Sequence, residues 1–367
     1  MTKRRLLMTA DSVGGVWQYA IDLADALARD HDVVIAHLGP APDTAQRAAL
    51  AARTSIRLVE TGQRLDWLAS DSAAVRAAAR GVAELAQAID ADIVQLNSPA
   101  LAGAYRFDRP VVAVDHGCVA TWWDAVRPGE APPAAMRWHV ELVGQGLRAA
   151  DCVVTPTAAY GEAVRRCYAL PFAPLAVHNG RTRLTRPEGV PTRRAFTAGR
   201  LWDAAKSTPL LDAVAARLPI PFVAAGPATA PYGEAVTLDH LCHLGTLGEH
   251  GLARQLAQRP VFVSAARFEP FGLAVLEAAS AGCPLVLSDI PAFRELWDGA
   301  AHFVAGEAPD DWARAIMALA DDPHEAAWLG QAAAARAARR TPAAMAEGMR
   351  AAFARVAPPA RLRERAA

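Results

Sequence analysis

Two glutamates, Glu269 and Glu277, stand eight positions apart in a stretch that reads VFVSAARFEPFGLAVLEAASAGCPLVLSD, residues 261–289. The stretch predicts a buried strand, a sharp corner at Phe-Glu-Pro-Phe-Gly, a helix ended by a glycine and a proline, and a second strand. A helix rises about 1.5 Å per residue, so the two carboxylates can lie at most about 12 Å apart. That separation suits two acidic groups that hold hydroxyl groups at two ends of one ligand, on either side of a diphosphate.

Between the two carboxylates lie backbone N–H groups at a predicted helix N-terminus, where anions are favoured. They belong to Phe271, Gly272 and Leu273. The segment from Glu269 to Glu277, EPFGLAVLE, resembles the donor-binding signature E-x-F-G-x-x-x-x-E of retaining glycosyltransferases of the GT-B fold, family four. The resemblance implies that Glu277 holds the ribose hydroxyls of a nucleotide sugar, and that Glu269 and these N–H groups hold the hexose. The alternative is a solvated glutamate pair on an ordinary surface helix.

The segment RAFTAGRLWDAAKST, residues 194–208, predicts a strand, a short loop and a helix. Its Lys206 is one of only two lysines in the chain, the other being Lys3, and arginine carries the positive charge elsewhere. A cation at a helix start opposes the helix dipole unless an anion binds there. The resemblance implies that Arg200 and Lys206 contact the donor diphosphate, where fixed cations stabilise the charge that develops on the leaving group. The alternative is two ordinary cations at a helix start.

The chain opens with the strand RRLLMTA (residues 4–10), a turn that contains Gly14 and Gly15, and a helix over 17–29. Strand, glycine turn and helix are typical of a nucleotide-binding α/β unit. The turn lacks GxGxxG, which disfavours a dinucleotide-binding dehydrogenase. The resemblance implies that the N–H groups of Gly14 and Gly15 approach the donor diphosphate. The alternative is a tight turn that needs glycine dihedral angles.

His116 ends the predicted strand PVVAVDHG, and functional residues in open α/β sheets gather at the carboxyl ends of strands. The resemblance implies that His116 contacts the donor sugar in a cleft; a histidine satisfied at a strand edge is the alternative. The next segment carries Trp122 and Trp123 in what reads as an unusual loop, and these rings could line an acceptor site or belong to the core. Gly245 lies in a later loop, which the resemblance places beside the nucleotide base.

Strand and helix patterns alternate along the chain, which predicts mostly parallel sheets covered on both faces. A chain of 367 residues suits two domains. We expect an acceptor-side domain over 1–180, a linker over 181–193, a nucleotide-sugar domain over 194–342, and a last helix and tail over 343–367. The resemblance implies an α/β protein of the GT-B fold: two Rossmann-like domains with a cleft between them, and a C-terminal helix that returns to the first domain.

The 38 acidic and 38 basic side chains give a formal net charge of zero, which argues against nucleic acid as a partner. The five cysteines are odd in number and contain no CxxC pair, so we expect reduced thiols in a cytoplasmic protein. No apolar segment is long enough to span a bilayer, so contact with the inner face of the membrane would be peripheral. Asp90-Ala91-Asp92 spells the DxD of metal-dependent glycosyltransferases of another fold, but it ends a predicted helix, so we interpret it as a helix-ending turn and expect no metal.

Together these features predict an enzyme, a hexosyltransferase-type glycosyltransferase that moves a sugar from a nucleotide-diphosphate sugar to an acceptor hydroxyl with retention of anomeric configuration. We expect glycan or polysaccharide biosynthesis as its setting, a glycan, lipid-linked or small-molecule acceptor, and no cofactor. Two alternatives stay open: a GT-B sugar phosphorylase or epimerase that uses the same cleft, and a non-catalytic nucleotide-sugar-binding protein. The nucleotide base, the sugar, the acceptor and the oligomeric state have no signature in the sequence.

Overall fold

The computed structural model describes residues 3–51, 53, 55–184 and 189–357. The chain divides into two compact units. The first unit runs up to Arg181 and resumes at Thr341, and the second spans Thr182–Arg340. The domain boundaries expected from the sequence, at residues 180, 193 and 342, remain a prediction, which limited proteolysis can test.

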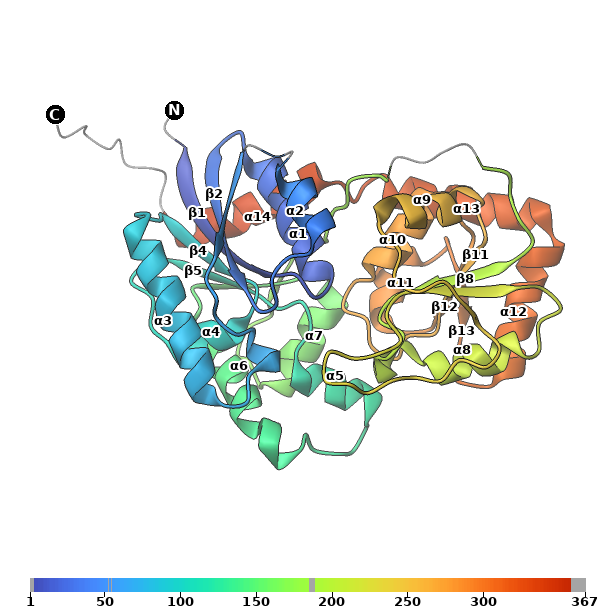
Figure 1. The fold of residues 1–367 in the computed structure, drawn as a ribbon, viewed down its shortest axis with the longest axis horizontal. Helices are drawn as coiled ribbons and strands as arrows, with labels where there is room; N and C mark the ends of the chain where they lie inside the picture. The colour runs from blue at the N-terminus through green and yellow to red at the C-terminus, as the bar shows by residue number, and fades with distance from the viewer. Residues whose placement is uncertain (1–2, 52, 54, 185–188, 358–367) are drawn as a thin grey trace. The chain divides into compact units, whose positions relative to one another are not determined.

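The first unit is built on a sheet of seven parallel strands (Figure 1). The strands are β1 (Arg4–Asp11), β2 (His31–Leu38), β3 (Ile56–Glu60), β4 (Ile93–Leu96), β5 (Val111–Val114), β6 (Cys152–Thr155) and β7 (Leu175–Ala176). Their spatial order is β3-β2-β1-β4-β5-β6-β7. The central strands are almost wholly buried and rich in β-branched residues, as expected for a parallel sheet with helices on both faces.

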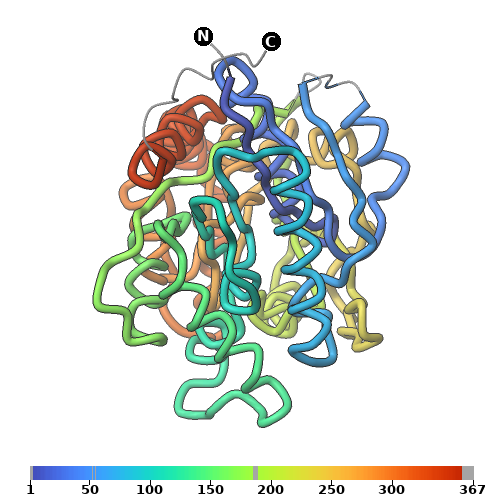
Figure 2. The backbone as a smooth tube through the Cα atoms, turned by 90° about the vertical axis from the view of Figure 1, so that its left-hand side faces the viewer, coloured from blue at the N-terminus to red at the C-terminus, as the bar shows by residue number. Residues whose placement is uncertain are grey.

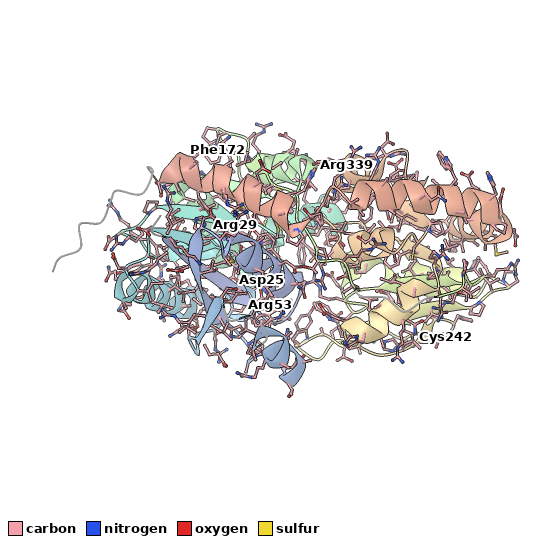
Figure 3. The ribbon with its side chains drawn as sticks, turned by 90° about the horizontal axis from the view of Figure 1, so that it is seen from above. Asp25, Arg29, Arg53, Phe172, Cys242 and Arg339 are labelled. Atoms are coloured by element: carbon pink, nitrogen blue, oxygen red, sulfur yellow. The ribbon has the colours of Figure 1, made fainter. Side chains whose placement is uncertain are left out.

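Helices cover both faces of this sheet and contribute its core. They are α1 (Gly15–Leu27), α2 (Thr44–Ala51), α3 (Ser72–Ala88), α4 (Pro99–Ala104), α5 (Val119–Val126), α6 (Arg137–Ala149), α7 (Ala158–Cys167) and α14 (Pro342–Val356), with 3-10 turns η1 (Asp66–Leu68) and η2 (Ala134–Met136). The ion pair between Asp25 of α1 and Arg53 closes at 2.6 Å (Figure 3). Figure 2 shows the loop between α5 and η2, residues 127–133, standing out from the unit.

The last helix, α14, belongs to the first unit although it follows the whole second unit in sequence (Figures 1 and 2). Its Met345, Met349 and Phe353 are fully buried and join the core that α1 forms over strands β1 and β2. Burial of three large apolar side chains contributes roughly 5–8 kcal/mol to the stability of this unit. The helix is therefore an integral part of the first unit.

The second unit contains a sheet of six parallel strands (Figure 1). These are β8 (Ala195–Ala198), β9 (Phe222–Ala225), β10 (Cys242–His243), β11 (Val261–Ser264), β12 (Leu285–Ser288) and β13 (His302–Val304), in the order β10-β9-β8-β11-β12-β13. Its helices are α8 (Thr208–Ala215), α9 (Glu249–Ala257), α10 (Leu273–Ser280), α11 (Pro291–Trp297), α12 (Pro309–Asp321) and α13 (Pro323–Ala337), with the 3-10 turn η3 (Ala204–Lys206). Separate apolar clusters fill the two faces of the sheet.

The α/β fold with two parallel sheets confirms the fold class predicted from the sequence. One local prediction was wrong: the segment with Trp122 and Trp123 is not a loop but helix α5, in which the two rings pack at 5.5 Å and stay partly buried. In residues 240–248 a short strand, Cys242–His243, is followed by the loop that contains Gly245. Asp90 lies in the turn after α3, as expected, and pairs with Arg109 at 3.0 Å.

None of the helices in the described part of the chain is long and apolar enough to cross a membrane. All five cysteines lie within the described residues, and none is in a disulfide.

Candidate functional site

The corner that follows β11 places Glu269 before α10 and Glu277 inside it, both partly buried. Gly272 is the N-cap of α10 and has φ +89°, a left-handed conformation that favours glycine. A Cβ at Gly272 would also lie 3.1 Å from the ring of Phe293 and 3.3 Å from the Glu269 side chain. No side chain forms a capping hydrogen bond at the N-terminus of α10, and the first turn of this helix contains no acidic residue.

Lys206 and Glu269 meet although they are far apart in sequence. Nζ of Lys206 lies 2.5 Å from Oε2 of Glu269, and the two side chains are 21% and 17% exposed. The contact exists because β8 and β11 are neighbours in the sheet, which brings the loops after both strands together. The N–H of Arg267 donates to the carbonyl of Ala205 at 2.8 Å and joins the two loops a second time.

Arg200 is held on the same loop by Asp203. The buried carboxylate of Asp203 accepts a hydrogen bond from Nη2 of Arg200 at 3.0 Å and one from the N–H of Ala205 at 3.0 Å. The second bond caps η3, whose last residue is Lys206. One carboxylate therefore positions the whole segment that carries both cations.

Glycines bring three strand ends close together beside Arg200. Gly226 follows β9 with φ +127°, and a Cβ there would lie 1.8 Å from the carbonyl oxygen of Gly199. The N–H of Gly226 donates to the carbonyl of Gly245 at 2.8 Å. Gly245, predicted from the sequence to border the nucleotide base, thus lies at the same edge of the sheet as the Gly199–Arg200 backbone.

In the first unit, Gly14 and Gly15 form the start of α1. Gly14 is its N-cap and is extended, with φ −151° and ψ −154°, and no side chain caps the helix. Neither glycine has a positive φ, so a left-handed turn is not what selects glycine here. Asp11 orders the turn by accepting a hydrogen bond from the N–H of Val13 at 2.9 Å.

His116 follows β5 and is anchored through one ring nitrogen. Its Nε2 lies 3.1 Å from Oδ1 of Asn97, and the Asn97 amide nitrogen donates to the carbonyl of Thr9 at 2.6 Å. This second bond fixes the amide orientation, so Oδ1 accepts and Nε2 of His116 carries the proton. The Tyr19 ring packs edge to face against the His116 ring, with the ring centroids 4.4 Å apart. Burial lowers the pKa of His116 to about 3, so the ring is neutral near pH 7 and presents Nδ1 as an acceptor.

Behind His116 lies a buried carboxyl group, Asp115. It accepts a hydrogen bond from the hydroxyl of Tyr160 at 2.9 Å and one from the N–H of Gly117 at 3.0 Å. Burial raises the pKa of Asp115 despite both bonds. These contacts fix the backbone around His116 within the first unit.

The structure therefore groups the predicted residues by unit. Those of the second unit gather at the carboxyl ends of β8, β10 and β11: Arg200, Lys206, Gly245, Glu269, Phe271, Gly272, Leu273 and Glu277. The first unit carries Gly14, Gly15 and His116. Sequence reasoning missed Asp203, Asn97 and Tyr19, although Asn97 directly follows a predicted strand and the strand-end rule could have found it. In the described ranges, no three His, Cys, Asp or Glu side chains are arranged to hold a metal ion.

Comparison with known sequence families decides the class of protein. Residues 13–181 match the family described as Glycosyltransferase Family 4, and residues 192–322 match the family described as Glycosyl transferases group 1. The chain belongs to the GT-B glycosyltransferases. Membership of these families confirms the prediction that the protein is a glycosyltransferase enzyme.

Solved structures show the same fold over nearly the whole glycosyltransferase. Sucrose-phosphate synthase from Thermosynechococcus elongatus matches with a TM-score of 0.76 at 16% identity, over 96% of this chain and 98% of that one. Anabaena Alr3699/HepE in complex with UDP and glucose matches with a TM-score of 0.72 at 16% identity, over 96% of this chain and 100% of that one.

A short segment also resembles a curated protein, the serotype-specific mannosyltransferase WbdA of Escherichia coli. The two are 36% identical over 73 residues, which is 20% of this glycosyltransferase and 9% of WbdA. The match therefore spans less than a tenth of the curated relative.

Proposed function

We propose that this glycosyltransferase moves a hexose from a nucleoside-diphosphate sugar to an acceptor hydroxyl with retention of anomeric configuration, in the cytoplasm and in glycan or polysaccharide biosynthesis. One observation carries the proposal: Lys206 from the loop after β8 and Glu269 from the corner after β11 meet at 2.5 Å. They meet at the sheet edge from which α10 starts, with its N-terminus uncapped by side chains. A cation, a carboxylate and a helix N-terminus at one edge suit a ligand that has both an anion and sugar hydroxyls.

The donor diphosphate would replace carboxylates as the partner of both cations. In the structure Lys206 is paired with Glu269, and Arg200 with Asp203. When the diphosphate binds Lys206, the Glu269 carboxylate becomes an acceptor for hydroxyl groups of the hexose. Glu277, farther along α10, would accept from the ribose hydroxyls. HepE, a structural relative, has been solved with UDP-glucose, which supports a nucleotide sugar as the donor class.

The proposed reaction needs no covalent nucleophile from the protein. The bond between the anomeric carbon and the diphosphate breaks, the acceptor oxygen bonds to the same face of that carbon, and the acceptor proton passes to the leaving diphosphate. Arg200, Lys206 and the N–H groups at the start of α10 stabilise the charge on the leaving group. No metal and no cofactor take part in this proposal.

The first unit would serve recognition of the acceptor and of the donor. Neutral His116, fixed by Asn97 through Nε2, presents Nδ1 as a hydrogen-bond acceptor for a sugar hydroxyl. The N–H groups of Gly14 and Gly15 would face an anion at the uncapped start of α1. A glycan, a lipid-linked sugar or a small molecule with a free hydroxyl would fit as acceptor, and any membrane contact would be peripheral.

Release of nucleoside diphosphate from a panel of nucleotide sugars tests the proposal. Replacing Lys206 by Ala should lower the release rate at least about a hundredfold, because the cation acts on charge that develops in the transition state. Lys3→Ala is the matched control, since Lys3 is the other lysine and binds the carbonyl of Ala28. Near-normal turnover by Lys206→Ala would contradict the assignment. Sugar 1-phosphate formed only when inorganic phosphate is added would instead identify a phosphorylase.

A further inference from the structure

Two aromatic side chains of the second unit stand beside Arg200 without a role in the mechanism above. The rings of Trp202 and Tyr232 pack edge to face with centroids 5.7 Å apart. The Arg200 guanidinium carbon lies 5.7 Å from the centre of the Trp202 ring. Tyr232 is 63% exposed, so one of its faces is open to solvent. An exposed tyrosine ring and a partly buried tryptophan ring beside the Arg200 guanidinium suggest contact with a planar ligand group.

The loop that carries Tyr232 is held in a defined conformation by its own backbone hydrogen bonds. It joins β9 to β10 and forms a short hairpin, in which Thr229 and Ala235 pair in antiparallel fashion. The N–H of Ala230 donates to the carbonyl of Glu234 at 2.6 Å, and the N–H of Gly233 donates to the carbonyl of Ala230 at 2.9 Å. Ala230 is buried at the base of this turn. Tyr232 therefore sits at the tip of a closed turn that holds its ring against Trp202.

The order of the strands places the loop with Tyr232 on the other side of β8 from the loop with Glu269. β8, which leads to Arg200, lies between β9 and β11. Tyr232 is on the loop after β9, whereas Glu269 is on the loop after β11. In a nucleotide sugar the base and the hexose lie at opposite ends of the diphosphate. With the diphosphate at Arg200 and the hexose at Glu269, the base points to the side of β9.

We propose that Trp202 and Tyr232 form a stacking wall for the nucleobase of the donor. The inference rests on the proposed function, because it takes the anion bound by Arg200 to be the donor diphosphate. Every nucleobase can stack on an aromatic ring, because each base has a π face. The wall therefore contributes to the affinity for the donor more than to the selection of a particular base. Purine bases cover more of the rings than pyrimidines and should depend on them more.

Titration calorimetry of the full chain with UDP, GDP, ADP and inorganic pyrophosphate tests the wall. Tyr232→Ala should weaken the tightest-binding nucleoside diphosphate about 5- to 50-fold, from the known range of base–aromatic stacking. Pyrophosphate has no base, so its affinity should stay within about twofold. Tyr232→Phe keeps the ring and should bind like the wild type. Trp328→Ala, which removes another exposed aromatic ring of the second unit, should change neither affinity.

The outcomes separate this inference from the function beneath it. Unchanged nucleoside-diphosphate affinity in Tyr232→Ala overturns the wall and leaves the donor assignment intact. An equal loss of nucleotide and pyrophosphate affinity also overturns it, because the ring would then act only through Arg200. Unchanged nucleotide affinity with a raised acceptor KM would assign the rings to the acceptor. A wild-type protein that binds none of the nucleotides would refute the proposed function itself.

Discussion

Replacing Glu269 by glutamine gives a prediction that separates donor binding from turnover. Glutamine keeps the size of the side chain but removes the negative charge that faces Lys206 at 2.5 Å. A nucleoside diphosphate presents its own negative charge to the same ammonium group. Glu269→Gln should therefore bind a nucleoside diphosphate more tightly than the wild type, and yet transfer the hexose more slowly because the carboxylate that orients its hydroxyls is gone.

The size of the gain follows from the pair's burial. Two unit charges about 4 Å apart interact by about 4 kcal/mol at an effective dielectric constant of about 20, whereas fully exposed pairs contribute about 0.2–1 kcal/mol. Lys206 and Glu269 are 21% and 17% exposed and lie between these limits. Removing the competing carboxylate should improve the affinity by about 1–2 kcal/mol, or about 5- to 30-fold.

Titration calorimetry with UDP and GDP measures this affinity, and release of nucleoside diphosphate from the donor measures turnover. The control is Glu162→Gln, which breaks an exposed pair with Arg165 in the first unit and should change neither quantity. The reasoning would be refuted by weaker or unchanged nucleotide binding in Glu269→Gln, since Lys206 would then not be the cation for which diphosphate and carboxylate compete.

Three further predictions concern stability and the position of Arg200. Burial holds the pKa of His116 near 3 in the folded state. As the pH falls from 7 to 5, the His116 ring is therefore protonated only in the unfolded chain, which lowers the free energy of unfolding. In urea titrations over this pH range the wild type should lose about 2 kcal/mol more stability than His116→Gln. Ser207 is buried with φ +52° and a hydroxyl that lacks a hydrogen-bond partner, so Ser207→Gly should raise the melting temperature by about 2–4 °C in a thermal scan. Gly226→Ala should weaken pyrophosphate binding at least about tenfold in calorimetry, because the Cβ would meet the Gly199 carbonyl at 1.8 Å and push the Arg200 backbone aside.

Each of these has a result that counts against it. Equal losses of stability in the wild type and His116→Gln would show that the ring is not kept neutral by the fold. A lower melting temperature for Ser207→Gly would mean that the serine side chain contributes more than its strained backbone costs. Gly306→Ala is the control for Gly226→Ala, because Gly306 has φ +81° but open space around it. Equal effects of the two would point to backbone strain rather than to displacement of Arg200.

Local sequence signals predicted the corner that carries Glu269 and Glu277 well. All the signals lie within one stretch of chain: a run of β-branched residues, a Pro-Phe-Gly corner, a segment of helix-favouring residues and a glycine that ends the helix. The strand and the helix therefore form where the pattern indicates. The helix over Trp122 and Trp123 was missed because these residues have weak intrinsic helix preference and are held in α5 by packing against α6 and α7.

The contacts that assemble the site could not be predicted from the sequence. Lys206 and Glu269 are 63 positions apart, and their pairing depends on β8 lying next to β11, which no local pattern encodes. The same holds for Tyr232 against Trp202, since the loop over 226–241 has neither the periodicity nor the apolar content of a packed element. The resemblance to a family implied roles for single residues, but it did not indicate which carboxylate pairs with which cation.

The central claim is that the second unit holds a nucleoside-diphosphate sugar through Lys206 and Glu277. A thermal-shift titration of the full chain with a panel of nucleotide sugars tests it most directly, with Lys206→Ala, Glu277→Ala and Lys3→Ala measured beside the wild type. At a ligand concentration of about 100 times Kd, at least one nucleotide sugar should raise the melting temperature of the wild type and of Lys3→Ala by about 5–10 °C. The shift should be largely lost in the other two variants. A panel in which no nucleotide sugar shifts the wild type, or in which Lys206→Ala shifts as much as the wild type, would contradict the claim.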